Sequence, residues 1–291
     1  MRTVRAPATS ANLGSGFDTF GVALERPADI VSVERAERTT IEITGAGAEF
    51  IPEDPKKNTV GAVAEALDAP AHIRIDKGVR PASGLGSSAA SAAGAALALN
   101  DLYDRGLSRE ELVPIAAEGE AVVSGAAHSD NVAPSLLGGF TIATADGVRS
   151  VDTNVPLVAC LPEEPISTRD AREVVPSHVT IEELVTTVGS ASTLTVGMCQ
   201  SNPELVGRGM ADEVVTPNRA SLITGYDDAV AAAEEAGAYG VTVSGSGPSL
   251  LAVCSPDRRR AVAAAMVEAF AENGENARAY RTWTGSGAEF V

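Results

Sequence analysis

The chain has 291 residues, of which 44% are hydrophobic and 21% charged, a composition typical of a globular protein with a substantial buried core. Its formal net charge of −17 argues against nucleic acid as a partner, because phosphate backbones are bound by basic surfaces. No apolar run approaches the roughly 20 residues of a membrane span, so we also expect no membrane partner.

The N-terminus and the cysteines indicate the compartment. The segment MRTVRAPATSANLG lacks the apolar core of a signal peptide, so we expect a cytoplasmic protein. The three cysteines, Cys160, Cys199 and Cys254, lie far apart without metal-ligand spacing, which predicts free thiols. Many carboxylates and only three lysines favour a surface adapted to concentrated salt, where self-repulsion is screened.

Hydrophobic periodicity predicts a mixture of strands and helices in the first half of the chain. A glycine- and serine-rich loop at 77–87 precedes an alanine-rich helix, and the next helix opens with a cap-like Ser108. The expected strands are 2–10, 30–36, 40–44, 71–76 and 136–146, and the expected helices are 58–68, 88–103 and one that begins at Ser108.

The second half begins with VPLVACLP (155–162) and continues into a mostly helical stretch with glycine and proline breaks. It ends in strands at 240–244, 249–254 and 277–283, with a helix at 257–273 before the last strand. Strands and helices alternate too irregularly for a doubly wound parallel sheet, so we expect the α+β class. A boundary near 150–155 predicts two domains, 1–152 and 153–291.

The first stretch that suggests chemistry is PATSANLGSGFD (7–18). The chain leaves a predicted strand through Asn12, Gly14 and Gly16 and ends at Asp18. Glycine and small polar residues together with a carboxylate are typical of a ligand-binding loop, and they fit an ordinary surface loop equally well.

The second stretch, PASGLGSSAAS (81–91), lies at a predicted helix start. The free N–H groups of a first turn and the positive end of the helix dipole form an anion site, and glycine allows the backbone to approach a phosphate. The stretch is not a Walker A loop, because Ser87 follows Gly86 where lysine is required, and it lacks the third glycine of a Rossmann fingerprint. A serine-capped helix after a glycine turn is the alternative.

Two further stretches combine small polar and charged residues. Glu120 lies late in a predicted helix, His128 follows eight residues later, and Asp130 and Asn131 come directly after it. Such a segment can supply a metal ligand and polar substrate contacts, and the alternative is a structural histidine. GVTVSGSGPSLLAV (240–253) contains two predicted strands and a glycine- and serine-rich connection longer than a tight turn requires. The segment fits a simple hairpin, and it also fits a backbone that is brought close to a ligand.

Together, PATSANLGSGFD, PASGLGSSAAS and SGSGPS resemble, in this order, the three motifs of the GHMP small-molecule kinases. Within that superfamily TSANLGxGFD (Thr9–Asp18), HxDNVAP (His128–Pro134) and ISTxxAR (Ile166–Arg172) resemble the homoserine kinases, with Ser15 where the family usually has proline or a small apolar residue. The resemblance implies an N-terminal domain like the second domain of ribosomal protein S5, a ferredoxin-like C-terminal domain, and ATP and substrate in the cleft between them.

The implied reaction is ATP-dependent phosphorylation of the L-homoserine hydroxyl to O-phospho-L-homoserine, in threonine biosynthesis, by an enzyme that is often a homodimer. Lys77 would reach the nucleotide phosphates, Asn58 would belong to the adenine pocket, and Ser88 and Glu120 would hold Mg²⁺. The implied nucleotide contacts in the loop and the first helical turn are Pro81, Ser83, Gly84, Leu85, Gly86, Ser87, Ser88 and Ala89.

The resemblance also implies a site for a zwitterionic amino acid. Arg172 and Arg219 would hold the α-carboxylate, as suits the guanidinium fork. The contacts to the ammonium and hydroxyl groups would be Asn12, Asp18, His128 and Asp130, and the residues that close the cleft would be Ser246 and Gly247. Asp130 is the nearest candidate for a general base beside the catalytic cation Lys77, although a loose phosphoryl-transfer transition state requires no strong base.

Two other interpretations stay open. Another GHMP kinase, such as an archaeal-type shikimate kinase or a mevalonate kinase, acts on a substrate without an ammonium group, which does not explain Asp18 beside Asn12 together with two arginines. A GHMP-fold sensor that binds ligand without transferring phosphate would be expected to lack Glu120 or the serines of the loop. Here Glu120, Ser87 and Ser88 are all present, which favours the enzyme.

Overall fold

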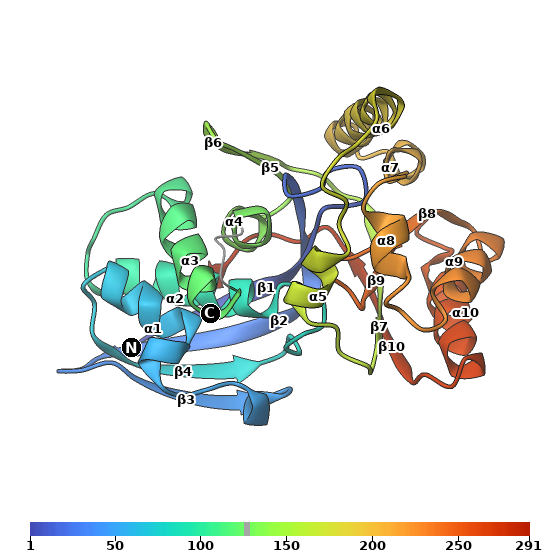
Figure 1. The fold of residues 1–291 in the computed structure, drawn as a ribbon. Helices are drawn as coiled ribbons and strands as arrows, with labels where there is room; N and C mark the ends of the chain where they lie inside the picture. The colour runs from blue at the N-terminus through green and yellow to red at the C-terminus, as the bar shows by residue number, and fades with distance from the viewer. Residues whose placement is uncertain (125–128) are drawn as a thin grey trace.

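The computed structural model of the chain describes residues 1–124 and 129–291. Two β-sheets form the frame of the molecule, and helices cover them (Figure 1). The α+β class expected from the sequence is confirmed. Within the described ranges, no helix is both long and apolar enough to cross a membrane.

The first sheet has the order β11-β1-β2-β4-β3, with β5 paired to β2 and β6 paired to β5. Its pairs are antiparallel except for β3 and β4, which run parallel. The strands are β1 (Arg2–Ala11), β2 (Phe20–Arg35), β3 (Thr40–Gly45), β4 (Ala71–Lys77), β5 (Phe140–Thr144), β6 (Gly147–Val151) and β11 (Glu289–Phe290).

Helix α2 (Ser87–Leu102) lies at the centre of the first half, packed against β1 and β2 on one side and against other helices on the other. Its alanine-rich sequence permits this close packing: a Cβ on Gly94 would lie 2.8 Å from Val31 Cγ2 of the sheet. The surrounding helices are α1 (Thr59–Ala66), α3 (Arg109–Ser124) and α4 (Ser129–Leu137), and short 3₁₀ turns are η1 (Ala48–Phe50) and η2 (Pro55–Lys57).

The second sheet is antiparallel throughout, in the order β10-β7-β9-β8. Its strands are β7 (Pro156–Pro162), β8 (Ala238–Val243), β9 (Leu250–Cys254) and β10 (Ala277–Trp283), and its helices are α5 (Thr168–Glu173), α6 (Ile181–Cys199), α7 (Pro203–Gly209), α8 (Thr216–Ala220), α9 (Tyr226–Glu235) and α10 (Arg259–Glu272). Helices α9 and α10 pack against this sheet and each other, α7 packs against β8 and β9, and α6 packs against α7 (Figure 1).

Strand β7 joins the two halves because its alternate side chains face different cores. Leu157 belongs to the large core of the first half, and its neighbour Val158 belongs to the core beneath α9 and α10. The chain changes sheets between β6 and β7, close to the predicted boundary at residue 152. The last residues of the chain return to the first sheet, where β11 pairs with β1. Both halves of the chain therefore contribute to that sheet, and the two-domain division stays a prediction.

The predicted strand at 136–146 is partly wrong. Residues 129–137 form helix α4, and the strand begins only at Phe140. Helix α4 contains a proline, Pro134. The helix lies so close to β2 that a Cβ on Gly21 would lie 2.0 Å from the carbonyl oxygen of Asp130. Local sequence did not reveal this, because the helix depends on packing against the sheet.

Candidate functional site

The first feature of the site is the N-terminal end of α2. Gly86 occupies the N-cap position with φ +62°, and no described side chain caps the helix there. The first helical hydrogen bond runs from Ala90 N–H to Gly86 C=O at 2.9 Å, so the N–H groups of residues 87–89 precede it. These groups and the positive end of the helix dipole favour an anion at this point.

The three glycine-rich motifs converge beside this helix end. Thr9 N–H of the first motif donates to the carbonyl of Leu85 in the second at 3.1 Å. Ser244 of the third motif donates from its hydroxyl to Gly84 C=O at 2.7 Å and lies 2.8 Å from the hydroxyl oxygen of Ser10. Gly245 N–H also donates to Ala11 C=O at 3.1 Å, so the third motif contacts both of the others.

Two glycines of the second motif are required by this packing. A Cβ on Gly84, whose φ is +75°, would lie 2.5 Å from the carbonyl oxygen of Ser244 and 2.7 Å from that of Gly247. A Cβ on Gly86 would lie 2.1 Å from Thr9 Oγ1, a buried hydroxyl that has no hydrogen-bond partner among the described residues. Close approach of backbone and a left-handed φ together explain why glycine stands at both positions.

Glu120 on α3 and Ser88 on α2 form the second feature. The Glu120 carboxylate is buried and accepts a hydrogen bond from Ser88. Burial, with Asp130 adding repulsion, raises its pKa to about 7, and the bond from Ser88 and the charge of Lys77 partly offset this. A carboxylate and a hydroxyl beside a second carboxylate are oxygen donors that fit Mg²⁺, whose charge would offset the burial of these anions.

Lys77 occupies a different position from the one expected. Its ammonium group forms a buried ion pair with Asp29 and also donates to Ser87 C=O and to Ser91 Oγ, both at 2.8 Å. Only 1% of the Lys77 side chain is exposed, and burial lowers its pKa although Asp29 opposes the change. The residue supports the first turn of α2 from behind, and its predicted contact with nucleotide phosphates stays a prediction.

Asp29 is a residue that the sequence analysis missed. It lies in β2 with no exposed surface, and its Oδ1 accepts the N–H groups of Gly78 and Val79 at 3.0 Å each. Through these bonds and the pair with Lys77, it joins the start of the loop before α2 to the first sheet. No local signal singled it out, because β2 also contains Glu25 and Glu34.

Asp18, Arg172 and Arg219 form the third feature, a cluster of opposite charges. Arg172 of α5 donates from Nη1 to Asp18 Oδ2 at 2.6 Å, and both side chains are about half exposed. Arg219 of α8 is buried; its Nε donates to Ala171 C=O at 3.1 Å and its Nη1 to Gly245 C=O at 2.6 Å. The structure therefore brings together three residues predicted to bind an amino acid.

Phe17 is a second residue that sequence reasoning missed. Its ring centroid lies 5.3 Å from the guanidinium carbon of Arg172 and 5.0 Å from that of Arg219. Burial lowers the pKa of Arg219, and the nearby charge of Arg172 adds to the lowering, while Asp18 opposes it. An aromatic ring attracts both cations without neutralising either, so it holds two like charges side by side.

The other predicted residues hold the loops in place. Asn12 donates to Gly245 C=O at 3.0 Å, and its side-chain oxygen accepts Asp18 N–H at 2.9 Å, which fixes the first motif against the third. Asn58 caps α1 through Val60 N–H at 3.1 Å, so its place in an adenine pocket stays a prediction. Ser246 and Gly247 lie in the third motif, and His128 lies outside the described residues.

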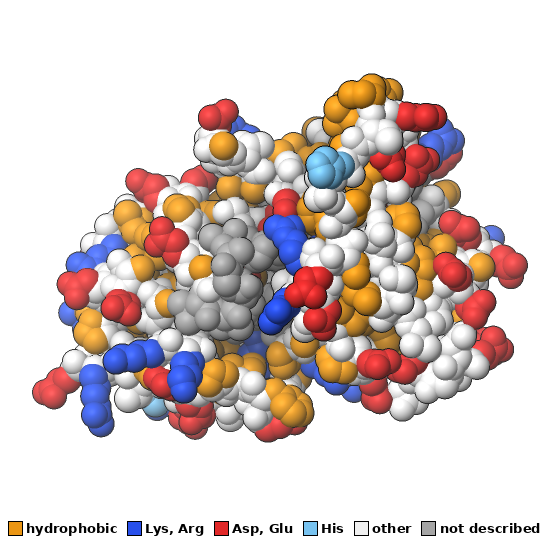
Figure 2. Space-filling view, viewed as in Figure 1, with side chains coloured by type: hydrophobic (Ala, Val, Ile, Leu, Met, Phe, Trp, Pro, Cys, Tyr) orange, Lys and Arg blue, Asp and Glu red, His pale blue; other side chains and the backbone are white. Residues whose placement is uncertain are grey.

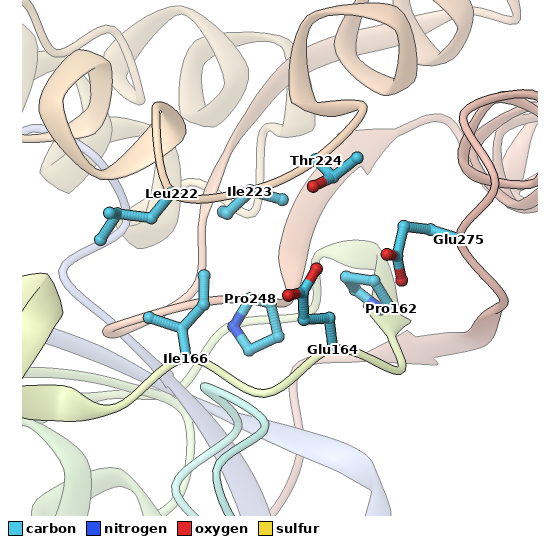
Figure 3. A pocket seen from close by; sticks show the side chains of 8 residues that line it. All are labelled: Pro162, Glu164, Ile166, Leu222, Ile223, Thr224, Pro248 and Glu275. Carbon is cyan, nitrogen blue, oxygen red and sulfur yellow. The ribbon is translucent and has the colours of Figure 1, made fainter.

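A small cavity in the second half lies apart from these features (Figure 3). The side chains of Glu164 and Glu275 lie at one side of it and those of Ile166 and Leu222 at the other. Its volume is about 10 Å³, too small for a substrate. Of the residues in the sequence motifs, Pro248 of the third motif and Ile166 of ISTxxAR line it.

Comparison with known proteins agrees with this geometry. The profile of the GHMP kinases N terminal domain matches residues 57–139, and that of the GHMP kinases C terminal domain matches residues 194–272. Homoserine kinase of Halorubrum lacusprofundi is 71% identical over 99% of this chain and 98% of its own length. That of Haloquadratum walsbyi is 73% identical over 99% of both chains.

Solved structures extend the similarity to the whole fold. Homoserine kinase from Cytophaga hutchinsonii superposes with a TM-score of 0.90 at 34% identity, covering 100% of this chain and 97% of that chain. L. major mevalonate kinase in complex with R-mevalonate superposes with a TM-score of 0.76 over 97% and 95% of the two chains. At 16% identity, the second similarity shows the fold alone.

Proposed function

This chain belongs to the homoserine kinases of the GHMP kinase family, and we propose how its residues divide the work of that reaction. The enzyme transfers the γ-phosphoryl group of ATP to the hydroxyl of homoserine. One observation carries the assignment of residues: Arg219 donates to Gly245, and the adjacent Ser244 donates to Gly84. The loop for phosphates and the anchor for an amino acid are thereby joined through one short segment.

The nucleotide would bind at the end of α2. The N–H groups of residues 87–89 would donate to phosphate oxygens, and the loop 81–86 would wrap around them. The absence of a described side-chain cap at Gly86 supports this, because these N–H groups otherwise have no acceptor in the first turn. Asn58 would lie near the adenine, and Lys77 would support the helix from behind.

Magnesium would be held by Ser88 and Glu120. When bound, Mg²⁺ neutralises charge on the phosphates and on the oxygen from which the phosphoryl group departs. The protein supplies a carboxylate that is already buried and hydrogen-bonded to Ser88, so little rearrangement of these side chains is needed. Asp130, close enough to raise the pKa of Glu120, would add negative charge to the same region.

On binding, homoserine would replace an ion pair between two side chains with contacts to its own charged groups. Asp18 and Arg172 bind each other at 2.6 Å, and the ammonium and carboxylate of an amino acid are complementary to these two partners. Arg219 would provide a second cation for the substrate carboxylate. Its guanidinium group is positioned by two backbone carbonyls, those of Ala171 and Gly245. Asn12, His128, Ser246 and Gly247 would complete the walls of the site.

Transfer then depends on position more than on a strong base. An in-line displacement passes through a loose transition state in which the hydroxyl keeps its proton until late. Asp130 would accept that proton, since it is buried on α4 near both Glu120 and Arg219. The cytoplasmic location and the homodimer expected from the sequence are part of this proposal.

A substrate panel tests the proposal. Purified enzyme with ATP and Mg²⁺ should release ADP with L-homoserine, and far more slowly with 4-hydroxybutanoate, which lacks the ammonium group, or 3-aminopropan-1-ol, which lacks the carboxylate. Asp18→Asn should reduce the difference between the rates of ADP release with homoserine and with 4-hydroxybutanoate. Turnover of mevalonate or shikimate in preference to homoserine would overturn the assignment.

A further inference from the structure

The carboxylate of Asp212 accepts hydrogen bonds from the residues that begin α8. The N–H group of Val214 donates to Oδ1 at 2.9 Å, and that of Val215 lies 3.2 Å from both oxygens. The N–H group and the hydroxyl of Thr216 donate to Oδ2 at 2.7 Å and 2.8 Å. Arg219 lies one turn further along the same helix. We propose that Asp212 is a positioning residue for homoserine binding, because it fixes the helix that carries Arg219.

These bonds use the capacity of the Asp212 carboxylate. An ionised carboxylate has about four lone-pair sites on its two oxygens, and four groups of residues 214–216 donate to this one. Little capacity is left for the ammonium group of a substrate. Asp212 therefore acts through α8 and does not bind homoserine itself. The inference rests on the proposed function, since Arg219 is the residue proposed to bind the substrate carboxylate.

Helix α8 depends on this cap because it is short. It has five residues, with a proline in its first turn, and a helix of this length is not stable in water by itself. Val215 at the N-cap position contributes no side-chain cap, so Asp212 supplies the acceptor. Thr216 Oγ1 also lies 3.2 Å from Thr242 Oγ1 of β8, which joins the capped turn to the second sheet. Arg219 N–H donates to Val215 C=O at 3.1 Å, so the backbone of the arginine follows the capped turn directly.

The side chain of Arg219 has little freedom to correct a displacement of α8. The residue is only 6% exposed, and two backbone carbonyls and the ring of Phe17 hold its guanidinium group. By contrast, Figure 2 shows basic and acidic side chains next to each other at the surface around α5, and Arg172 of that helix is about half exposed. The charge of Asp212 also opposes the lowering of the pKa of Arg219 that burial causes. A shift of α8 would therefore move the guanidinium group out of its contacts.

The segment between α7 and α8 also holds the loop of the first motif. Ser15 donates from its hydroxyl to Gly209 C=O at 2.6 Å, at the end of α7. A Cβ on Gly14 would lie 2.0 Å from the carbonyl oxygen of Met210, so the loop packs directly against this segment. One short segment thus contacts both the loop that supplies Phe17 and the helix that supplies the buried arginine. Capping of α8 thereby sets the position of the ring relative to the guanidinium group.

Steady-state kinetics with homoserine and ATP varied in turn tests the proposal. Asp212→Ala should raise the KM for homoserine by roughly tenfold to a hundredfold, because a displacement of about 1 Å in a group that positions a substrate costs up to a hundredfold. The KM for ATP and kcat should change much less. Asp212→Asn keeps one acceptor oxygen and should give a smaller rise.

A double-mutant cycle separates positioning from a general loss of structure. In the Arg219→Ala background, Asp212→Ala should change the KM for homoserine by less than about twofold, because its effect passes through the guanidinium group that is missing. Glu183→Ala is the matched control. Glu183 accepts the N–H group and the hydroxyl of Thr180 at the start of α6, a helix without a predicted site residue. This variant should lower the thermal unfolding temperature and leave both KM values unchanged.

Three outcomes would overturn the proposal: an unchanged KM for homoserine in Asp212→Ala, an equal rise in both KM values, or effects that multiply in the cycle. If Asp212→Ala does not fold, Asp212→Asn decides, and a KM equal to that of the parent would overturn the proposal. These outcomes leave the proposed function intact. A parent chain that does not phosphorylate homoserine, or an Arg219→Ala variant with the parent's KM, would refute the proposed roles themselves and this inference with them.

Discussion

The ammonium group of Lys77 and the carboxylate of Asp29 form an ion pair that is sealed from solvent directly behind the first turn of α2. Breaking such a pair on one side leaves an uncompensated buried charge, which costs about 3–5 kcal/mol. The same pair holds the start of the phosphate loop, through Gly78 and Val79, against β2. We therefore expect the pair to affect both the stability of the protein and the proposed binding of nucleotide.

We expect Lys77→Met to lower the free energy of unfolding by several kcal/mol, as measured by urea denaturation, because Asp29 loses its counter-charge. Ser91→Ala, which removes only a hydroxyl from the same network, should cost about 1 kcal/mol. A Lys77→Met variant with unchanged stability and a raised KM for ATP would contradict this expectation. Lys77 would then bind the nucleotide phosphates and would not stabilise the first turn of α2.

Glu120→Gln should lower kcat by two orders of magnitude or more, because the amide cannot supply the negative charge that Mg²⁺ requires. The same substitution should raise the stability of the folded protein. With a pKa raised to about 7, folded Glu120 holds a proton that the unfolded chain loses near its ordinary value of 4.5. Stability therefore falls as pH rises between these two values.

In EDTA at pH 8, we expect the Glu120→Gln variant to be more stable than the parent by roughly 3 kcal/mol, and equally stable below pH 4. Urea denaturation at both pH values measures the difference. An unchanged turnover rate would remove Glu120 from the metal site, and a stability difference of the same size at both pH values would contradict the raised pKa.

Arg219→Ala should raise the KM for homoserine by roughly a hundredfold and leave the KM for ATP nearly intact, because the lost guanidinium would bind the substrate carboxylate. Arg219→Lys should restore part of the affinity, since an ammonium keeps the charge and loses the fork. Steady-state kinetics with each substrate varied in turn separates the effects. Equal loss of affinity for both substrates would speak against a carboxylate role.

Phe17→Leu should raise the KM for homoserine by roughly twofold to thirtyfold with a smaller change in kcat, because the ring attracts both Arg172 and Arg219 by about 0.5–2 kcal/mol. Phe17→Tyr is the control, as it keeps an aromatic face, and should behave like the parent. Equal kinetics for the leucine and tyrosine variants would show that the ring contributes only its volume.

Gly84→Ala should abolish measurable ATP turnover, because its Cβ would collide with two carbonyl oxygens of the third motif. Gly106→Ala provides a matched control for backbone strain: its φ of +69° is similar, and no described atom lies within 4 Å of the position of its Cβ. The control should lose only about 1 kcal/mol of stability and remain active. Loss of activity in both variants would mean that strain, and not the meeting of the motifs, limits the enzyme.

Much of the fold followed from local pattern. The strands at 2–10 and 71–76 and the helix at 58–68 lie within a few residues of β1, β4 and α1, because alternation and helical spacing act between neighbours in the chain. The strand predicted to begin at 30 in fact begins at Phe20. Its first residues pair with β1 and β5, a contact that no local pattern reveals.

The sequence by itself determined the family, the reaction and the helix start on which phosphates are expected to bind, because glycine, serine and charge at fixed spacing suffice to identify them. Only the tertiary structure decided the partners of the charged groups. Lys77 meets Asp29 across 48 residues, and Phe17 meets Arg172 and Arg219 across more than 150. Such pairings depend on where distant segments pack, and the free energy of burying a charge or an apolar face is set by those distant neighbours.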